Sequence, residues 1–319
     1  MRAVVLDEQG RPGLTDVPEP KGDGKVVRVL ACGLCGSDVE KIGQAAPGTV
    51  LGHEVAAELP DGRRVALVHH LPCGKCERCM AGHESTCEEF RAATIEPGGF
   101  AERALAREWI DIPTAIPDEV ASFAEPLACV LRAVERVPRG RVLVVGCGFI
   151  GNLFVQVLRR RGDDVYGIDP RKDRLELAGV KSPRREVGAA ILAAPAGVET
   201  AVAKLAPGGT LLVFASGGPL DLDEVYRLEL HVLGSRSGTP RHVLAAVNLL
   251  PDLEPIPTTV LPLERFAEGL EAYTNGEAFK VVYTPCGRSS STGPATSGSR
   301  TFRSRSPSRA TSSSTWRSP

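Results

Sequence analysis

The pattern of hydrophobic and polar residues changes character near Pro126. Before this residue, short apolar runs alternate with turns rich in Pro, Gly and Asp, which is typical of β-strands. The predicted strands lie within residues 3–6, 26–31, 50–70 and 99–106. We therefore expect the first part of the chain to be all-β.

Beyond Pro126 the chain alternates between helix-like and strand-like patterns. Residues 127–137 have helical periodicity and end at Pro138, and the continuous apolar run at 141–146 has the length of a buried strand. Strands that alternate with helices form a parallel, doubly wound sheet with helices on both faces. Residues 256–285 then return to a strand, an amphipathic helix and a strand.

These patterns predict an α/β protein with four parts. The last part contains many Ser, few apolar residues and no periodicity, so burial cannot offset the entropy lost on ordering it. The predicted parts are a β domain at 1–133 with a Cys-rich lobe at about 71–90, a doubly wound domain at 134–255, a return to the first domain at 256–285, and a disordered Ser/Arg-rich tail at 286–319.

Charge narrows the class of protein further. The formal net charge is −1, but residues 287–319 contain six Arg and no acidic residue, so the rest carries 32 basic and 39 acidic groups. An acidic body argues against a nucleic-acid binder and against a polybasic membrane-surface protein. The sequence has neither an apolar run of transmembrane length nor a signal-peptide core, so we expect a cytoplasmic protein with no membrane partner. In that compartment, the nine Cys are expected to be metal ligands or buried thiols.

A glycine-rich motif follows the predicted strand at 141–145 and opens a helix. In this context the first glycine permits a tight turn, the second lets the backbone approach a pyrophosphate, and the third permits close packing of helix and strand. The helix N-terminus supplies free N–H groups and a favourable dipole for the phosphates. The motif, which predicts a dinucleotide site, is Gly146-Cys147-Gly148-Phe149-Ile150-Gly151.

Asp169 ends the next predicted strand, 18 residues after Gly151. A carboxylate at this position accepts hydrogen bonds from the adenosine ribose and repels a 2′-phosphate, which favours NAD over NADP. Arg171 and Lys172 follow closely and could neutralise a phosphate, so NADP stays open as the alternative cofactor.

Four cysteines cluster in the predicted lobe with C-x2-C-x2-C-x7-C spacing. Four thiolates this close in sequence fit a tetrahedral structural zinc, because a loop can fold around the ion. An iron–sulfur cluster is less well supported, since the run lacks the ferredoxin spacing. Zinc ribbons also occur in nucleic-acid binders, a class that the acidic body argues against. The four cysteines are Cys73, Cys76, Cys79 and Cys87.

Three further short motifs offer ligands for a second metal. Cys35 lies in Cys-Gly-Ser-Asp, His53 and Glu54 lie in Gly-His-Glu, and Glu125 lies in Glu-Pro-Leu. Thiolate, imidazole and carboxylate together suit a zinc ion that keeps an open position. Each motif alone is a weak signal, because a single buried Cys or His is more often part of a core.

The order of these motifs gives the chain its resemblance to a known family. Cys-Gly-Ser-Asp, Gly-His-Glu, the four-Cys lobe, Glu-Pro-Leu and the glycine-rich loop resemble, in that order, the medium-chain zinc-dependent alcohol dehydrogenases, in particular their sorbitol and threonine dehydrogenase branch. The resemblance covers residues 1–285 and implies a GroES-like β catalytic domain with a Rossmann domain. It also implies two zinc ions per chain, NAD(P), a small alcohol or carbonyl substrate, and a homodimer or homotetramer.

The resemblance also implies roles for residues around the second metal. Cys35 and His53 match zinc ligands of the family, and Glu54 matches the position that ligates zinc directly in the polyol branch. Glu125 matches a carboxylate that ligates zinc or holds its bound water. Asp38 matches the carboxylate that orients the zinc-bound histidine.

Three more residues are assigned by the same resemblance. Ser37 matches the hydroxyl that bonds the substrate alcohol and starts a proton relay, and Glu40 stands where the branch usually has the outer His of that relay. Lys280 matches a basic side chain that lies against the cofactor pyrophosphate. The implied reaction passes a hydride to nicotinamide from an alcohol whose pKa zinc has lowered.

Departures from the family pattern leave a second interpretation open. His53 follows only 18 positions after Cys35, and the segment between Asp169 and the apolar run at 189–194 is abbreviated, so one Rossmann strand is expected to be reduced. Together with Glu40, these departures support a dinucleotide-binding relative with impaired catalysis, acting as a sensor or partner protein. A zinc-ribbon nucleic-acid binder is the third hypothesis.

Overall fold

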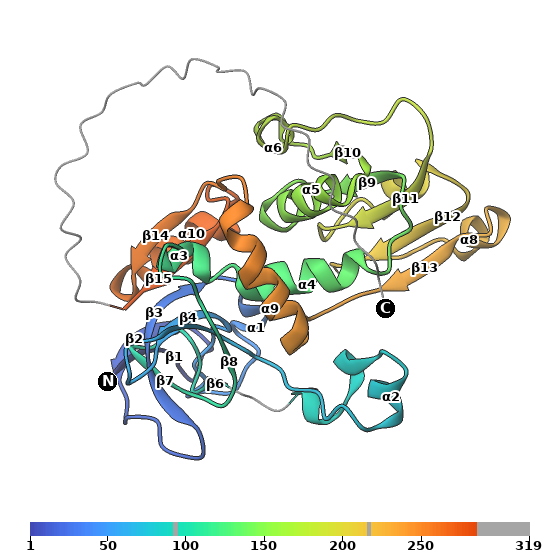
Figure 1. Cartoon of the computed structure of the whole chain (residues 1–319). Helices are drawn as coiled ribbons and strands as arrows, with labels where there is room; N and C mark the ends of the chain where they lie inside the picture. The colour runs from blue at the N-terminus through green and yellow to red at the C-terminus, as the bar shows by residue number, and fades with distance from the viewer. Residues whose placement is uncertain (92–94, 216–217, 286–319) are drawn as a thin grey trace, which may run out of the picture. The chain divides into compact units, whose positions relative to one another are not determined.

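The computed structural model describes residues 1–91, 95–215 and 218–285. All of them belong to one compact unit, Met1–Cys286. The architecture is α/β, as the sequence predicts, with a largely antiparallel sheet and a separate parallel sheet (Figure 1). The predicted tail at 286–319 lies outside the described residues. Within the described ranges, every helix is too short or too polar to cross a bilayer.

The first sheet is built around β3 and combines strands from both ends of the chain. Its strand order is β14-β15-β3-β4-β5-β8, and β7 pairs with β3 and β6, while β1 and β2 form a separate hairpin. The strands are β1 (Arg2–Leu6), β2 (Pro12–Asp16), β3 (Lys25–Gly33), β4 (Glu54–Glu58), β5 (Arg64–Leu67), β6 (Ile95–Glu96), β7 (Arg103–Ala106), β8 (Trp109–Asp111), β14 (Thr259–Pro262) and β15 (Val281–Thr284).

Short helices connect these strands and bring polar side chains to the sheet. They are α1 (Gly36–Lys41), α2 (Glu77–Met80), α3 (Asp118–Ala121) and α10 (Phe266–Thr274), with 3-10 turns η1 (Glu84–Thr86), η2 (Glu89–Arg91) and η4 (Leu263–Arg265). β15 pairs antiparallel with β3, so the C-terminal return contributes a strand to the N-terminal sheet.

The second sheet is parallel, with strand order β10-β9-β11-β12-β13. Its strands are β9 (Arg141–Val145), β10 (Asp164–Ile168), β11 (Val187–Leu192), β12 (Leu205–Val213) and β13 (His231–Gly234). The accompanying helices are α4 (Ala124–Val134), α5 (Phe149–Arg161), α6 (Lys172–Ala178), α7 (Val198–Val202), α8 (Leu222–Arg227) and α9 (Pro240–Leu249), followed by the turn η3 (Leu250–Asp252). Only α6 lies between β10 and β11, which agrees with the abbreviated segment seen in the sequence.

The apolar runs explain why this sheet forms. β9 is almost entirely buried and pairs with strands on both sides, so it needs apolar residues on both faces. α5 follows it and ends at Gly162, whose φ of 91° closes the helix in the left-handed region. Three Arg in the last turn of α5 interact favourably with the partial negative charge at the C-terminus of the helix.

α4 joins the two sheets through a shared hydrophobic core. It packs against α5 and α9, and its Leu127 and Val130 belong to the same buried cluster as Val142 of β9 and Ala56 of β4. The helix begins at Ala124, so its first turn carries Glu125.

Candidate active site

Cys35 lies at the junction of β3 and α1. It is the N-cap residue of α1, and its backbone N–H donates to Oδ2 of Asp38 at 3.1 Å. A carboxylate in the first helical turn is favourable because it accepts from backbone N–H groups that have no helical partner. This local closure fixes the direction in which the Cys35 thiol leaves the backbone.

Glu54, the first residue of β4, and His53, which directly precedes it, reach the same place from the strand next to β3. Donor atoms of Cys35, His53 and Glu54 all lie within 4.8 Å of one another. Both His53 and Glu54 are buried. A thiolate, an imidazole and a carboxylate grouped this closely fit a zinc ion with a fourth position left for substrate.

Asp38 connects the two segments that carry these ligands. Its Oδ1 lies 3.3 Å from Nδ1 of His53 and accepts from the backbone N–H of Gly52 at 3.2 Å. Burial alone would raise the pKa of Asp38, but the charge of His53 and these hydrogen bonds hold that pKa below its usual value. The carboxylate can therefore orient the imidazole so that Nε2 faces the metal position.

The two predicted relay residues lie on α1. Ser37 is half-buried, and its hydroxyl donates to Sγ of Cys35 at 3.4 Å. Glu40 is exposed on the same short helix. Residues three positions apart on a helix share a face, so Ser37 and Glu40 lead from the ligand group toward solvent.

Glu125 lies close to this group without belonging to it. The three-residue ligand group of the structure does not include Glu125, whose Oε1 accepts from the Cys129 thiol at 3.3 Å. Burial raises the pKa of Glu125, and the neighbouring charge of Glu54 adds to that effect. Glu125 therefore offers a carboxylate beside the metal position, with one oxygen used by Cys129.

The structure gives Lys280 a partner that the sequence did not predict. Its side chain is buried, and its ammonium forms an ion pair with Glu54 and donates to the carbonyl of Leu34 at 2.9 Å. Its ammonium also lies 4.4 Å from the ring centroid of Phe149, the first residue of α5, and the contact with a cofactor pyrophosphate stays a prediction. Lys280 directly precedes β15, and the pairing of β15 and β4 with β3 brings Lys280, Glu54 and Gly33 together.

His69 and His70, to which the sequence assigns only a structural role at the end of a strand, extend from the ligand group. The ring centroids of His53 and His69 are 5.0 Å apart, those of His69 and His70 are 3.9 Å apart, and His70 stacks on Phe90 at 4.5 Å. Burial, followed by the charge of His53, lowers the pKa of His69 to about 2 and of His70 to about 4. The only sequence signal was the His-His pair that precedes the Cys-rich lobe.

The glycine-rich loop has the geometry that a dinucleotide site needs. Gly146 adopts a φ of 89°, and a Cβ atom on Gly151 would lie 1.8 Å from the Gly146 carbonyl oxygen, so both positions exclude side chains. Gly148 is the N-cap residue of α5, whose first two residues are Phe149 and Ile150. A thirteen-residue helix therefore points its N-terminus at the loop, where phosphate groups are favoured.

Asp169 lies beside this loop at the end of β10. Its Oδ2 accepts from the Cys147 N–H at 2.8 Å and its Oδ1 from the Arg171 N–H at 2.9 Å. Arg174, which the sequence analysis missed, places Nη1 3.9 Å from Oδ2 of Asp169 and 3.8 Å from where a Cβ of Gly148 would be. The sequence signal that could have identified Arg174 is its position on the next helix, five residues after Asp169.

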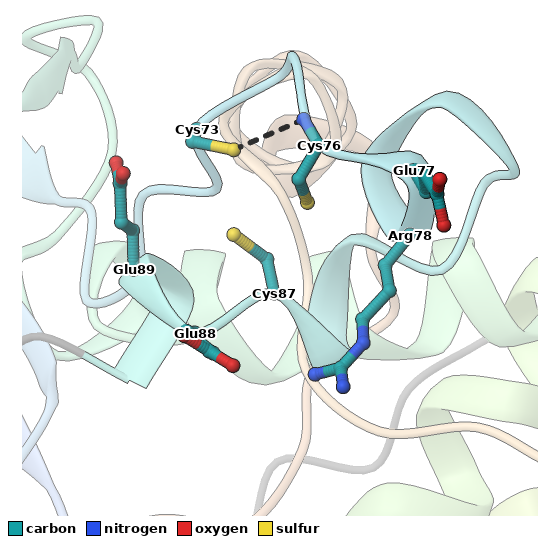
Figure 2. Close-up of a pocket in the computed structure, with 7 residues that line it drawn as sticks. All are labelled: Cys73, Cys76, Glu77, Arg78, Cys87, Glu88 and Glu89. Carbon is teal, nitrogen blue, oxygen red and sulfur yellow. Dashed lines mark hydrogen bonds between the residues drawn. The ribbon is translucent and has the colours of Figure 1, made fainter.

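The four cysteines of the lobe form a separate group. Their sulfur atoms all lie within 4.8 Å of one another, with 3.5 Å between Cys76 and Cys79 and 3.9 Å between Cys73 and Cys79. Zinc–sulfur bonds of about 2.3 Å in a tetrahedron place sulfur atoms about 3.8 Å apart, so these distances fit zinc. Figure 2 shows Cys73, Cys76 and Cys87 directed toward a common point, among Glu77, Arg78, Glu88 and Glu89.

The thiols of this group differ in their surroundings. Hydrogen bonds, the largest of them from the backbone of Cys73, lower the pKa of Cys87 to about 6. Burial and the neighbouring Cys76 raise the pKa of Cys79 to about 12. Such opposed values are expected where four thiols share one small space, and a divalent cation would stabilise all four as thiolates. The eight described cysteines are all free thiols.

Comparison with known proteins agrees with this arrangement. Residues 22–118 match the alcohol dehydrogenase GroES-like domain. The chain is 31% identical to D-altritol 5-dehydrogenase of Agrobacterium fabrum in an alignment of 285 positions, gaps included, that covers 74% of this chain and 84% of that protein. It is 29% identical to L-threonine 3-dehydrogenase of Symbiobacterium thermophilum in an alignment of 348 positions, gaps included, that covers 89% of this chain and 98% of that protein.

Solved structures show the same fold. A zinc-binding dehydrogenase from Sinorhizobium meliloti bound to NADP aligns with a TM-score of 0.78 at 25% identity, over 89% of this chain and 99% of that one. Galactitol-1-phosphate dehydrogenase from Escherichia coli aligns with a TM-score of 0.75 at 25% identity, over 89% and 100%. The GroES-like and Rossmann-type parts expected from the sequence are therefore both present.

Proposed function

This chain belongs to the medium-chain zinc-dependent alcohol dehydrogenase family, and we propose that it transfers a hydride between a polyol, sugar or amino-alcohol and NAD. The observation that carries the proposal is the grouping of Cys35, His53 and Glu54 within 4.8 Å. The names of the relatives, which include an altritol and a threonine dehydrogenase, support this range of substrates.

Cys35, His53 and Glu54 would hold the catalytic zinc, with Glu125 beside them for the ion or its water. Zinc in this position supplies a Lewis acid that makes an alcohol proton acidic near neutral pH. Asp38 keeps the His53 imidazole oriented, because its carboxylate accepts from Nδ1. The four cysteines of the lobe would hold a second, structural zinc.

Ser37 would accept the hydrogen bond of the substrate alcohol and carry its proton outward. The half-buried Ser37 hydroxyl lies 3.4 Å from the Cys35 sulfur, so it can meet a group placed at the open metal position. Glu40 is exposed three residues further along α1 and can pass the proton to solvent. A carboxylate in this role differs from the histidine of related enzymes in the pH range over which it accepts protons.

The loop Gly146–Gly151 would bind the cofactor pyrophosphate, with Phe149 and Ile150 at the start of the helix. A bound nicotinamide supplies the hydride acceptor. Asp169 favours NAD, because its carboxylate can accept from ribose hydroxyls and repels a 2′-phosphate. Arg174 lies next to Asp169 and Gly148 and would contact the same adenosine moiety.

A substrate panel tests the proposed function. Initial rates of NADH and NADPH formation are measured for zinc-loaded protein with polyols, aldoses, sugar acids and amino-alcohols. We expect at least one substrate to give rates that saturate with concentration, with kcat/KM higher for NAD. Turnover of no substrate by protein that binds two zinc ions and NAD would contradict dehydrogenase activity and favour the sensor interpretation. Light scattering of the same sample tests the expected homodimer or homotetramer.

A further inference from the structure

Lys280 and Glu54 form a buried ion pair directly behind the ligand group. Each residue is 1% exposed, and they are 226 positions apart in the chain. An ion pair removed from water is costly unless its geometry is good and its remaining hydrogen-bonding groups are satisfied. A pair this deeply buried is therefore expected either to have every hydrogen-bonding group paired or to serve the function of the site.

Three neighbouring strands build the pair. Gly33 of β3 lies opposite Glu54 of β4 on one side and Val282 of β15 on the other. A Cβ atom on Gly33 would lie 2.0 Å from Oε2 of Glu54 and 3.1 Å from Cε of Lys280. The ion pair thus crosses β3 at a position that only glycine leaves open.

The ammonium of Lys280 has a partner in each direction. It donates to Oε2 of Glu54 and to the Leu34 carbonyl at 2.9 Å, and it lies 4.4 Å from the ring centroid of Phe149. Two hydrogen bonds and one cation–π contact thus compensate the buried ammonium. Burial opposes the charged form, but Glu54 and then Cys35 hold the pKa of Lys280 above its usual value.

The same contacts leave Glu54 with one oxygen for a metal. Oε2 is occupied by Lys280, whereas Oε1 carries no hydrogen bond among the described residues. Cys35 as a thiolate and Glu54 as a carboxylate would offset both charges of a divalent zinc. Lys280 adds one positive charge to that balance and keeps the carboxylate from rotating.

We propose that Lys280 is a positioning residue for the catalytic metal: it fixes Glu54 through Oε2 so that Oε1 faces the ion. Phe149 opens the cofactor helix, so the same ammonium also links the metal centre to the dinucleotide loop. The inference rests on the metal centre of the proposed function, but it concerns metal binding and not turnover.

The test compares Lys280→Gln and Lys280→Arg with the wild-type protein. Zinc affinity is measured by competition with a chromophoric chelator, and coordination is followed in the visible spectrum of protein with cobalt at the catalytic position. We expect Lys280→Gln to retain the four-cysteine zinc, to bind the catalytic zinc about 10–100-fold more weakly, and to change the cobalt spectrum. Lys280→Arg should restore most of the affinity. Wild-type affinity and spectrum in Lys280→Gln would overturn the proposal.

Lys25→Gln is the matched control. Lys25 lies on β3 and places its ammonium 5.4 Å from the Trp109 ring, away from the metal ligands. Lys25→Gln removes a lysine–aromatic contact of the same kind that does not involve a metal ligand. Zinc affinity should therefore stay within about twofold of wild type. Equal losses of zinc affinity in Lys25→Gln and Lys280→Gln would overturn the specific role of Lys280.

A double substitution keeps the test decisive if Lys280→Gln does not fold, because Glu54 would then be buried without its partner. Glu54→Gln is compared with Glu54→Gln combined with Lys280→Gln. If Lys280 acts through Glu54, the second change raises the melting temperature that Glu54→Gln lowers and alters zinc affinity less than about twofold. A further loss of zinc affinity in the double variant would overturn the proposal. Polyol turnover by wild-type protein is a separate result and decides only the proposed function.

Discussion

Oδ1 of Asp38 lies 3.3 Å from Nδ1 of His53 and also accepts the backbone N–H of Gly52 at 3.2 Å. One buried carboxylate thus sets both the path of the chain before His53 and the tautomer of its ring. Nε2 is left as the nitrogen with a lone pair for a metal.

Asp38→Asn should weaken the catalytic zinc site without removing a ligand. An amide places an N–H donor or a weaker acceptor beside Nδ1, so the ring loses the partner that orients it. We expect zinc affinity at this site to fall about 10–100-fold, measured by chelator competition. Asp61→Asn is the control, because Asp61 is exposed and pairs with Arg63 at the surface. Equal affinities in wild type and Asp38→Asn would contradict the assigned role.

Zinc stoichiometry should separate the two metal sites. Wild-type protein is expected to hold two zinc ions per chain, and Cys35→Ser and Cys79→Ser one each. Cys35→Ser should keep its melting temperature within a few degrees, whereas Cys79→Ser should lower it clearly, because a structural zinc contributes directly to folding. Elemental analysis and thermal unfolding give both readouts. Two zinc ions in Cys35→Ser would place the second ion elsewhere.

Cofactor choice should depend on Asp169. Asp169→Ser removes the carboxylate that lies against the loop, so NAD should bind about 10-fold more weakly while NADP binding improves or stays constant. Calorimetry with each dinucleotide measures both changes. Arg174→Gln in the same background should then reduce NADP affinity, because Arg174 would be the cation next to the 2′-phosphate. Parallel losses for NAD and NADP in Asp169→Ser would speak against a role in discrimination.

Acid should destabilise the protein partly through His70. Burial, followed by the charge of His53, lowers the pKa of His70 to about 4. Between about pH 6.5 and pH 4 the unfolded chain therefore binds a proton at His70 that the folded protein does not bind. Stability from this group is complete above about pH 6.5 and is lost as the pH falls toward about 4. We expect a loss of about 1–2 kcal/mol between pH 7 and pH 5.

His70→Phe tests this pH dependence. Phenylalanine keeps the ring stacked on Phe90, which lies 4.5 Å from the His70 centroid, but cannot be protonated. Urea unfolding of wild type and variant at the two pH values should give a shallower decrease for the variant, with zinc content checked at each pH. The same decrease in both proteins would remove His70 as the cause.

The parts of the site that depend on local spacing could be predicted from the sequence. Gly151 is excluded from carrying a side chain by the Gly146 carbonyl oxygen of the same turn, and Cys73 and Cys76 lie in one short loop. Such features need only a few neighbouring residues to adopt the right conformation, so their spacing identifies them.

The parts of the site that depend on contacts between distant residues could not be predicted from the sequence. Lys280 meets Glu54 because β15 pairs with β3, and no sequence pattern near Lys280 indicates that Glu54 is its partner. The contact between the tilted rings of His53 and His69 likewise joins residues that are 16 positions apart in the chain. The family resemblance assigned Lys280 to the pyrophosphate, which stays a prediction, and gave no sign of the buried ion pair with Glu54.

The central claim is that Cys35, His53 and Glu54 form a zinc centre that supports hydride transfer. The most direct measurement is the transfer of deuterium from the carbinol carbon of a deuterated panel substrate to the nicotinamide ring, followed by mass spectrometry. Wild-type protein with two zinc ions should give deuterated reduced cofactor, and Cys35→Ser should give essentially none. Equal deuterium transfer by Cys35→Ser, or none by wild type with any panel substrate, would contradict the claim.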